Sequence, residues 1–196
     1  MSDSHLAREA APEYARRGGA RLTYDDYCRA PAGLRYELVE GDLRMTPSPS
    51  VTHQRISGRL EALLREWVEG RGLGEILHAP IDVVLSEHNV VQPDILMVCR
   101  ERHGIVKEAN IQGAPDLIVE VLSPGSLEWD RVTKRHLYAR YGVREFWIVD
   151  PEGCTIEVAV LQGGELATLQ VYPLGARFVS PLLPGFEPSI DRVFRT

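Results

Sequence analysis

The spacing of apolar side chains along the chain predicts a mixture of helices and strands. From about His53 to Glu69, apolar residues recur at i, i+4, i+7, i+8 and i+11, as on one face of an amphipathic helix, and they are Ile56, Leu60, Leu63, Leu64 and Trp67. A second helix is predicted from about Glu128 to Tyr141, ended by Gly142. Shorter apolar runs predict strands at Tyr36–Val39, Leu43–Met45, Ile81–Leu85, Val90–Cys99, Asp116–Leu122, Glu145–Val149, Thr155–Leu161 and Ala167–Tyr172.

Short turn sequences indicate how these strands are connected. Glu40-Gly41-Asp42 predicts an N-terminal hairpin, Glu87-His88-Asn89 a second hairpin, and Gly163-Gly164 a C-terminal hairpin. The order strand, helix, strand over about 116–149 predicts a β-α-β unit, expected to be parallel and right-handed. The predicted fold class is therefore α/β, with a central mixed sheet flanked by helices and a hairpin near each end.

The ends of the chain and one glycine-rich stretch are predicted to lie outside the main helices and strands. Residues 1–20 are polar and predict a tail, which leaves 21–196 as one domain. Thr23 and Asp26 form a capping-box pattern for a short helix that stops before Pro31. The Gly70–Gly74 run follows a helix rather than a strand, so it predicts a helix stop and not a nucleotide loop. The proline-rich C-terminus is expected to lie over the surface.

Composition narrows the class of protein. The chain has 196 residues, 44% hydrophobic and 26% charged, which suits one folded domain with a core. A net charge of −6 excludes a basic protein that coats nucleic acid, although a local basic cleft is compatible with it. Three widely spaced cysteines without a C-x-x-C pair argue against a disulfide scaffold or structural zinc site. With no secretory h-region and no apolar run of about 18 residues, we expect a cytoplasmic protein without a membrane segment.

Several common catalytic motifs are missing from the sequence. There is no G-x-x-x-x-G-K-[ST] loop and no G-x-S-x-G elbow, and the histidines lack metal-ligand spacing. Of 22 basic residues only Lys107 and Lys134 are lysines. A lysine in so arginine-rich a chain either marks a place that needs a compact, titratable amine or is there by chance.

Two carboxylates on predicted strands are the strongest chemical signal. Asp94 lies within one predicted strand, on the face that also carries Leu96 and Val98. Glu120 lies in the middle of another, on the face that also carries Ile118 and Leu122. A buried acid is costly without a partner, and two on neighbouring strands repel each other unless a divalent cation lies between them. The alternative is that each acid binds an arginine or a loop N–H at a sheet edge.

The order of these residues resembles the PD-(D/E)XK nuclease superfamily, and more narrowly the bacterial Uma-two family of restriction-endonuclease-like proteins. Pro93-Asp94 is followed, after 25 residues, by Glu120-Val121-Leu122. The similarity covers about residues 21–194, and its other matching stretches are 36–43, His53, Gln92, 115–124, Asp130, Lys134, Tyr138, 142–143 and 145–151. The chain departs from the superfamily pattern at Leu122, where a lysine is expected, and Lys134 on the following helix matches the position from which this branch takes its amine.

The resemblance implies a restriction-endonuclease-like fold and a catalytic set of Asp94, Glu120 and Lys134, with Glu37 as a third acid. Asp94 and Glu120 would bind Mg²⁺ or Mn²⁺ together with a strand carbonyl, that of Val121. Two alternatives for single residues stay open: Lys134 as an ordinary surface partner of Asp130, and Glu37 as a solvated hairpin side chain.

The resemblance also implies a nucleic-acid substrate, in the first place DNA, with possible contacts from His53, Arg131 and Arg135. For assembly we expect a homodimer or a higher homo-oligomer. Two other functions remain open at this stage: a catalytically silent nuclease fold used for binding or assembly, and a metallohydrolase that acts on a small phosphate ester.

Overall fold

The computed structural model describes residues 21–31, 33–124 and 127–195, so the predicted tail at 1–20 lies outside the described residues. The first elements match their predictions. Thr23 caps α1 (Tyr24–Cys28) through a capping box with Asp26. β1 (Arg35–Val39) and β2 (Asp42–Thr46) pair antiparallel as the N-terminal hairpin. The long amphipathic helix is α2 (Val51–Val68), with Ser50 accepting a hydrogen bond from its first turn.

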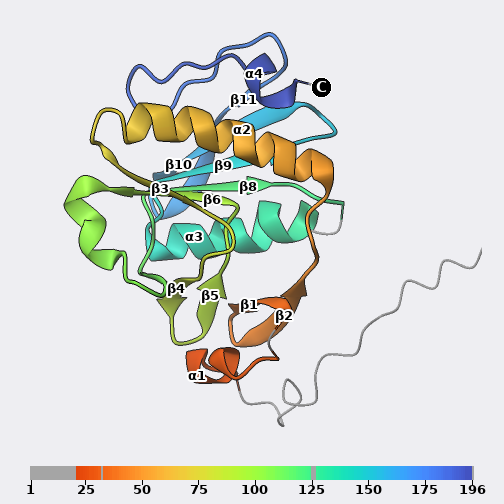
Figure 1. Cartoon of the computed structure of the whole chain (residues 1–196), viewed down its shortest axis with the longest axis vertical. Coiled ribbons are helices and arrows are strands. Elements are labelled where there is room, and N and C mark those ends of the chain that lie inside the picture. The colour runs from red at the N-terminus through yellow and green to blue at the C-terminus, as the bar shows by residue number, and fades with distance from the viewer. Residues whose placement is uncertain (1–20, 32, 125–126, 196) are drawn as a thin grey trace, which may run out of the picture.

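The larger of two sheets is mixed and has six strands (Figure 1). In spatial order these are β11 (Glu165–Tyr172), β10 (Thr155–Gln162), β9 (Glu145–Asp150), β8 (Leu117–Val121), β6 (Ile95–Cys99) and β3 (Gly74–His78). β8 and β9 are parallel and the other neighbours antiparallel, which confirms the parallel pairing of the β-α-β unit and the C-terminal hairpin. Mixed sheets are buried on both faces where helices cover them.

The connection from β8 to β9 is helical but not uniformly α-helical. It begins with the π-helical segment η3 (Trp129–Lys134) and continues as α3 (Arg135–Tyr141). Gly142 ends the helix with a φ of +83°, a left-handed conformation that favours glycine. The predicted helix and its stop are therefore confirmed, whereas the π-helical turn is a feature that periodicity does not report.

A second, five-stranded sheet corrects one predicted strand. Its spatial order is β2, β1, β5 (Asn89–Val91), β4 (Val83–Ser86) and β7 (Ile111–Gln112). The hairpin of β4 and β5 is antiparallel as predicted. The single strand predicted over Val90–Cys99 is wrong, because β5 belongs to this sheet and β6 to the larger one. Pro93, which lacks a backbone N–H, lies between the two strands and cannot continue a hydrogen-bonded ladder.

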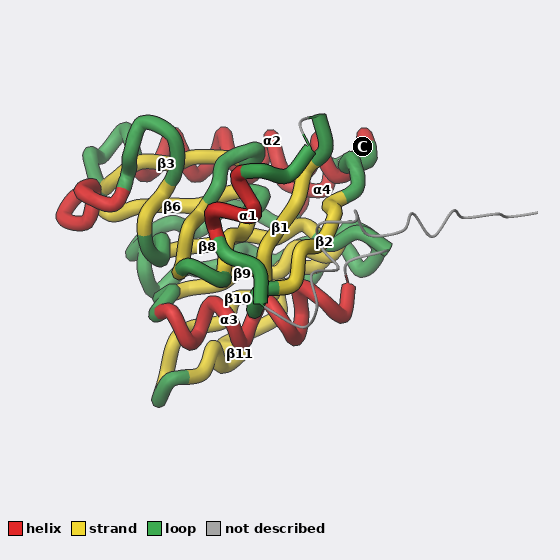
Figure 2. The backbone as a smooth tube through the Cα atoms, turned by 90° about the horizontal axis from the view of Figure 1, so that it is seen from below, coloured by secondary structure: helices red, strands yellow, loops and turns green. Residues whose placement is uncertain are grey.

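Helices cover both faces of the larger sheet. Figure 1 shows α2 above this sheet, α3 beneath it and the smaller sheet farther below; Figure 2, seen from below, has α1 and the smaller sheet nearest the viewer. Side chains alternate between the faces: Met97, Val119 and Trp147 belong to the cluster under α2, and Ile118 and Phe146 to the cluster around α3. None of the helices in the described ranges is long and apolar enough to cross a membrane.

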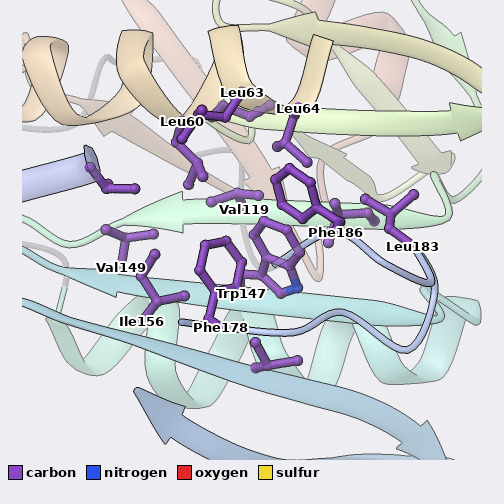
Figure 3. Close-up of a cluster of buried hydrophobic side chains, with 14 of the residues drawn as sticks. Leu60, Leu63, Leu64, Val119, Trp147, Val149, Ile156, Phe178, Leu183 and Phe186 are labelled. Carbon is purple, nitrogen blue, oxygen red and sulfur yellow. The ribbon is translucent and has the colours of Figure 1, made fainter. Parts of the chain in front are cut away.

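The C-terminal segment and a strand after α2 were not predicted correctly. β3 follows the glycine-rich stretch that predicted only a helix stop, and it pairs with β6 at the edge of the sheet. The proline-rich C-terminus does not simply lie over the surface, because it inserts Phe178, Leu183 and Phe186 into the core under α2 (Figure 3). Ile190 belongs to the same buried cluster. Trp147 meets the ring of Phe178 edge-on, with 5.0 Å between centroids. Proline spacing predicts irregular backbone but not which side chains become buried.

If this segment is part of the core, truncating one of its rings should destabilise the whole domain. We expect Phe178→Ala to lower the free energy of unfolding by about 3–5 kcal/mol, because it leaves a cavity beside Trp147. Urea unfolding followed by tryptophan fluorescence measures this. The neighbouring exposed Val179 supplies the control, since Val179→Ala should change the free energy by less than about 0.5 kcal/mol. Equal effects of the two variants would contradict the assignment.

Candidate active site

A cavity of about 1080 Å³ collects all four predicted catalytic residues, Glu37, Asp94, Glu120 and Lys134. They reach it from different elements: Glu37 from β1, Glu120 from β8, Lys134 from the end of η3, and Asp94 from the residue before β6. The floor of the cavity thus lies where the two sheets and the helical connection meet.

Lys134 is the centre of a buried ionic cluster. Its Nζ lies 2.8 Å from Oε1 of Glu37, 2.9 Å from Oε1 of Glu120 and 3.4 Å from Oδ1 of Asp130. The lysine is only 4% exposed, so the alternative of an ordinary surface pair with Asp130 is wrong. The contact with Glu120 is the one expected if the amine comes from the helix rather than from position 122.

Burial and charge together set the protonation of this cluster. Burial acts to lower the pKa of Lys134, but the charges of Glu120 and Glu37 outweigh it and raise that pKa well above its usual value. The ammonium therefore stays charged at neutral pH. Burial, reinforced by Asp130, Asp94 and Glu37, raises the pKa of Glu120 well above its usual range in spite of Lys134. With three acids around one ammonium, ionising Glu120 is unfavourable, and an added cation would relieve this cost.

Tyr138 holds Glu120 from the helix side. Its hydroxyl donates to Oε1 of Glu120 at 2.6 Å, on the same oxygen that accepts from Lys134. Burial, followed by the charge of Glu120, raises the pKa of Tyr138 well above its usual value, so the phenol remains a donor. Glu120 is thus oriented by two fixed donors that bind the same oxygen.

Asp94 is oriented on the other side of the floor by α2 and β8. Its Oδ2 accepts from the backbone N–H of Val121 at 2.8 Å and lies 3.1 Å from Nε2 of His53. Burial acts to lower the pKa of His53, but the hydrogen bond and charge of Asp94, with the backbone of Val121, raise it above the ordinary value. His53 is therefore placed as a partner of Asp94, beside the cavity that it helps to line.

Glu37 is also held at one oxygen. Its Oε1, in contact with Lys134, accepts the backbone N–H of Gln92 at 2.9 Å. Burial of Glu37 contradicts the alternative of a solvated hairpin side chain. Asp94, Glu120 and Glu37 share one arrangement: one carboxylate oxygen of each binds two groups, while the other oxygen makes no hydrogen bond to any residue that the structure describes.

The residues that could hold a divalent cation form an oxygen-donor set. Within the described ranges, no group of three or more histidine, cysteine, aspartate or glutamate side chains is arranged as a metal site. The predicted set has only two side chains, Asp94 and Glu120, completed by the backbone carbonyl of Val121. Carboxylate and carbonyl oxygens suit Mg²⁺ or Mn²⁺, with water or phosphate in the remaining positions. The carboxylate oxygens that make no hydrogen bond to a described residue, and the cost of ionising Glu120 beside the other acids, agree with such an ion.

The two arginines predicted as substrate contacts are engaged within the protein. Arg131 lines the cavity but pairs with Asp150 at 3.1 Å and Glu157 at 3.5 Å. Arg135 does not line the cavity, and its guanidinium binds Glu157, the carbonyl of Leu166 and the hydroxyl of Thr168. Arg135 therefore braces the helix against the C-terminal hairpin, which argues against its predicted contact with substrate.

Three residues of the site were not among the predicted functional residues, namely Asp130, Tyr138 and Gln92. The available signal was the i, i+4, i+8 spacing of Asp130, Lys134 and Tyr138, which places them on one helix face. Spacing alone does not say whether such a face is solvated or buried. Gln92 could not be identified in this way, because it binds Glu37 through its backbone N–H, which every residue except proline has.

The second Pro-Asp dipeptide, at Asp116, serves the opposite end of β8. Its fully buried carboxylate accepts the backbone N–H of Cys99 at 2.8 Å and pairs with Arg102 at 3.0 Å and Arg144 at 3.4 Å. Asp116 does not line the cavity, as expected for a residue about 13 Å along the strand from Glu120. Bound to a backbone amide and two arginines at the start of β8, Asp116 is a structural anchor and not part of the site.

Comparisons with known proteins agree with this architecture. A family model, Uma2, described as "Putative restriction endonuclease", matches residues 22–192. A crystal structure of "a putative nuclease belonging to DUF820" from Anabaena variabilis superposes with a TM-score of 0.75 at 21% identity, covering 88% of this chain and 97% of that one. At this identity the superposition establishes the fold.

One curated relative matches by sequence. It is the "Uncharacterized protein slr1290" of Synechocystis sp., 31% identical over 106 residues. The match covers 54% of this chain, and the chain spans about half, 54%, of that relative's length.

Removing the ammonium from the buried cluster should be strongly destabilising. We expect Lys134→Met to lower the free energy of unfolding by about 3–5 kcal/mol, because it leaves buried carboxylates without their counter-charge. Adding Glu120→Gln should recover part of this loss. Chemical unfolding of the single and double variants measures both effects, and the exposed lysine serves as control through Lys107→Met, expected within about 0.5 kcal/mol. A harmless Lys134→Met would mean that the cluster is not buried in solution.

The Asp116 cluster predicts a pH dependence. Burial acts to raise the pKa of Asp116, but the Cys99 amide and Arg102 outweigh it and hold that pKa below its usual value. An acid with a lowered folded pKa stabilises the fold above its unfolded pKa, about 3.9, and this contribution disappears as the pH falls through the folded value. We therefore expect Asp116→Asn to lose about 1–3 kcal/mol at pH 7.

The difference between parent and Asp116→Asn should shrink as the pH falls below about 4. Urea midpoints across that range test this, with the exposed Asp42→Asn as control. A difference that does not change with pH would argue against the ionised carboxylate as its source.

Proposed function

The chain belongs to the Uma2 family of restriction-endonuclease-like proteins, and on that premise we propose that it is a divalent-metal-dependent phosphodiester hydrolase acting on nucleic acid, in the first place DNA. One observation carries the proposal. Lys134 reaches Glu120 with 2.9 Å between Nζ and Oε1, although Leu122 occupies the position where the superfamily has its lysine. The acid and the amine that the superfamily pattern pairs are thus in contact by another route.

Asp94 and Glu120 would bind the ion with the carbonyl of Val121. When bound, Mg²⁺ or Mn²⁺ would neutralise phosphate charge and lower the pKa of a nearby water. The residues of the chain supply the rest. Lys134 fixes one oxygen of Glu120 and brings a permanent positive charge to the cavity floor, where negative charge develops on a phosphate under attack.

The groups around this set act by position. Tyr138 and Lys134 fix Glu120, and His53 with the Val121 amide fixes Asp94. Glu37, itself held by the Gln92 amide, binds the same ammonium as Glu120 and so limits where Nζ can lie. Fixed donors and acceptors cost no reorganisation during the reaction, which is the main source of electrostatic catalysis.

A catalytically silent binding protein is the second candidate. It is favoured by one feature, namely that Lys134 is already engaged by acids, in a site where the described residues present no three-residue metal group. The two candidates differ in whether a bound cation leads to cleavage.

We expect Mg²⁺- or Mn²⁺-dependent cleavage that EDTA abolishes, measured on plasmid, linear duplex, single-stranded DNA and RNA. Asp94→Asn, Glu120→Gln and Lys134→Ala should each lower the rate by about 100-fold or more. Lys134→Arg should also lose most activity, because a broad guanidinium cannot occupy the position of a compact amine. Lys107→Ala, which changes the other lysine at an exposed position, should cleave at the parent rate.

Binding of Mn²⁺, measured by calorimetry, separates metal binding from chemistry. Asp94→Asn and Glu120→Gln should weaken it while the thermal midpoint stays the same or rises, since the unmetallated acids repel each other. Mn²⁺ binding without cleavage of any substrate would favour the silent binding protein. A folded Lys134→Ala protein that cleaves at the parent rate would remove Lys134 from the mechanism.

A further inference from the structure

The walls of the cavity differ in chemistry from its acidic floor. β2 contributes Met45, 40% exposed, and the stretch around η3 contributes Leu127 and Val132, 41% and 49% exposed. Large apolar side chains that gather in the open around a cavity mark a ligand surface. Apolar side chains offer nothing to bind a charged phosphate group, whereas they can pack against the apolar face of a nucleobase.

A cation and an aromatic ring are in contact in the lining of this cavity. The exposed guanidinium of Arg44, on β2, lies over the half-buried indole of Trp129, on η3, with 4.3 Å between Cζ and the ring centroid. Both residues line the cavity. Indole rings and guanidinium planes are the groups on which unpaired bases stack in proteins that bind single strands.

A second, smaller hollow of about 320 Å³ adjoins the cavity at Asp94. It shares Arg35, Pro49 and Asp94 with the main cavity, so the two spaces meet at the acid that is expected to bind the ion. Its lining includes the polar side chains of Gln54 and Ser57 on α2. A chain of nucleotides can thus extend past Asp94, whereas a small phosphate ester would need only the cavity.

Gly58 keeps this hollow open. It lies inside α2, where glycine costs about 1 kcal/mol relative to alanine. Packing does not require it, because a Cβ at this position would meet no atom within 4 Å. The residue lines the hollow, and the absence of a side chain there leaves room for a ligand against the helix.

We infer that the site takes an unpaired polynucleotide strand, which stacks a base on the Arg44–Trp129 pair, crosses Asp94 and continues along Gly58. This inference rests on the proposed function and specifies its substrate class. The bases of an intact duplex are stacked on their own neighbours, so they cannot offer a face to Trp129 without being unstacked. DNA and RNA share this chemistry, and the experiment separates them.

Fluorescence anisotropy with labelled oligonucleotides, in Ca²⁺ in place of Mg²⁺, tests the inference on the full chain. The probes are single-stranded DNA of about 4 and about 12 nucleotides, the longer strand as a duplex, and its RNA counterpart. We expect the long single strand to bind at least about tenfold more tightly than the duplex. Trp129→Leu should weaken binding of the long single strand about tenfold. Trp129→Phe, which keeps a ring, should retain most of the affinity.

Gly58→Leu tests the path beyond Asp94 without touching the catalytic set. It should leave the fold at least as stable, because leucine is the better helix former. It should weaken binding of the strand of about 12 nucleotides several-fold and change binding of the strand of about 4 nucleotides little. Ala62→Leu, at an exposed position of α2 outside the hollow, is the matched control and should change neither. Equal effects of Gly58→Leu and Ala62→Leu on binding of the long strand would overturn the claim that the strand continues along Gly58.

The outcomes separate this inference from the proposed activity. If the duplex binds as tightly as the single strand and folded Trp129→Leu is unaffected, the substrate class is wrong, even if the protein cleaves DNA. If single strands bind as expected but no substrate is cleaved in Mg²⁺ or Mn²⁺, the hydrolase fails and the strand-binding site stands. Absence of binding to every oligonucleotide overturns the inference and leaves the apolar wall to a protein partner.

Discussion

The burial of one ammonium among three carboxylates is the constraint on which the rest of the site depends. Lys134 contacts Glu37 from the smaller sheet, Glu120 from the larger sheet and Asp130 from its own helical segment. Removing ions from water costs several kcal/mol each, and only close, well-oriented partners recover that cost. The two sheets and the helix are therefore held in one relative arrangement, because a shift of any of them would leave a buried charge without its partner.

The same constraint explains why the site is prepared for a cation. Asp94, Glu120 and Glu37 each bind donors through one oxygen and leave the other unengaged toward the described residues. Internal hydrogen bonds thus fix the direction of each acid without using its full capacity. The charge that remains is unfavourable for stability alone, which is common where a fold is organised for binding.

The helical connection, which begins with a π-helical turn, contributes to both the wall and the floor of the cavity. Trp129 begins it at the cavity wall, and Lys134 ends it at the cavity floor, before α3 continues with regular geometry. Single π-helical turns within α-helices are frequent at functional sites, because the extra residue changes the direction of the side chains that follow. Tyr138, one turn farther on, then reaches the same oxygen of Glu120 as Lys134.

The sequence by itself determined most of the local elements and indicated the acids and the amine of the floor. Helical spacing located α2 and turn residues located the hairpins, since these signals depend on neighbours along the chain. The order of Asp94, Glu120 and Lys134 along the chain indicated the family. Only the tertiary structure decided that Val90–Cys99 divides between two sheets, that Phe178 and Phe186 enter the core, and that Arg135 braces a hairpin. It also decided that Lys134 is buried, because burial and ion pairing depend on residues far away in the chain, such as Glu37, which periodicity cannot bring together.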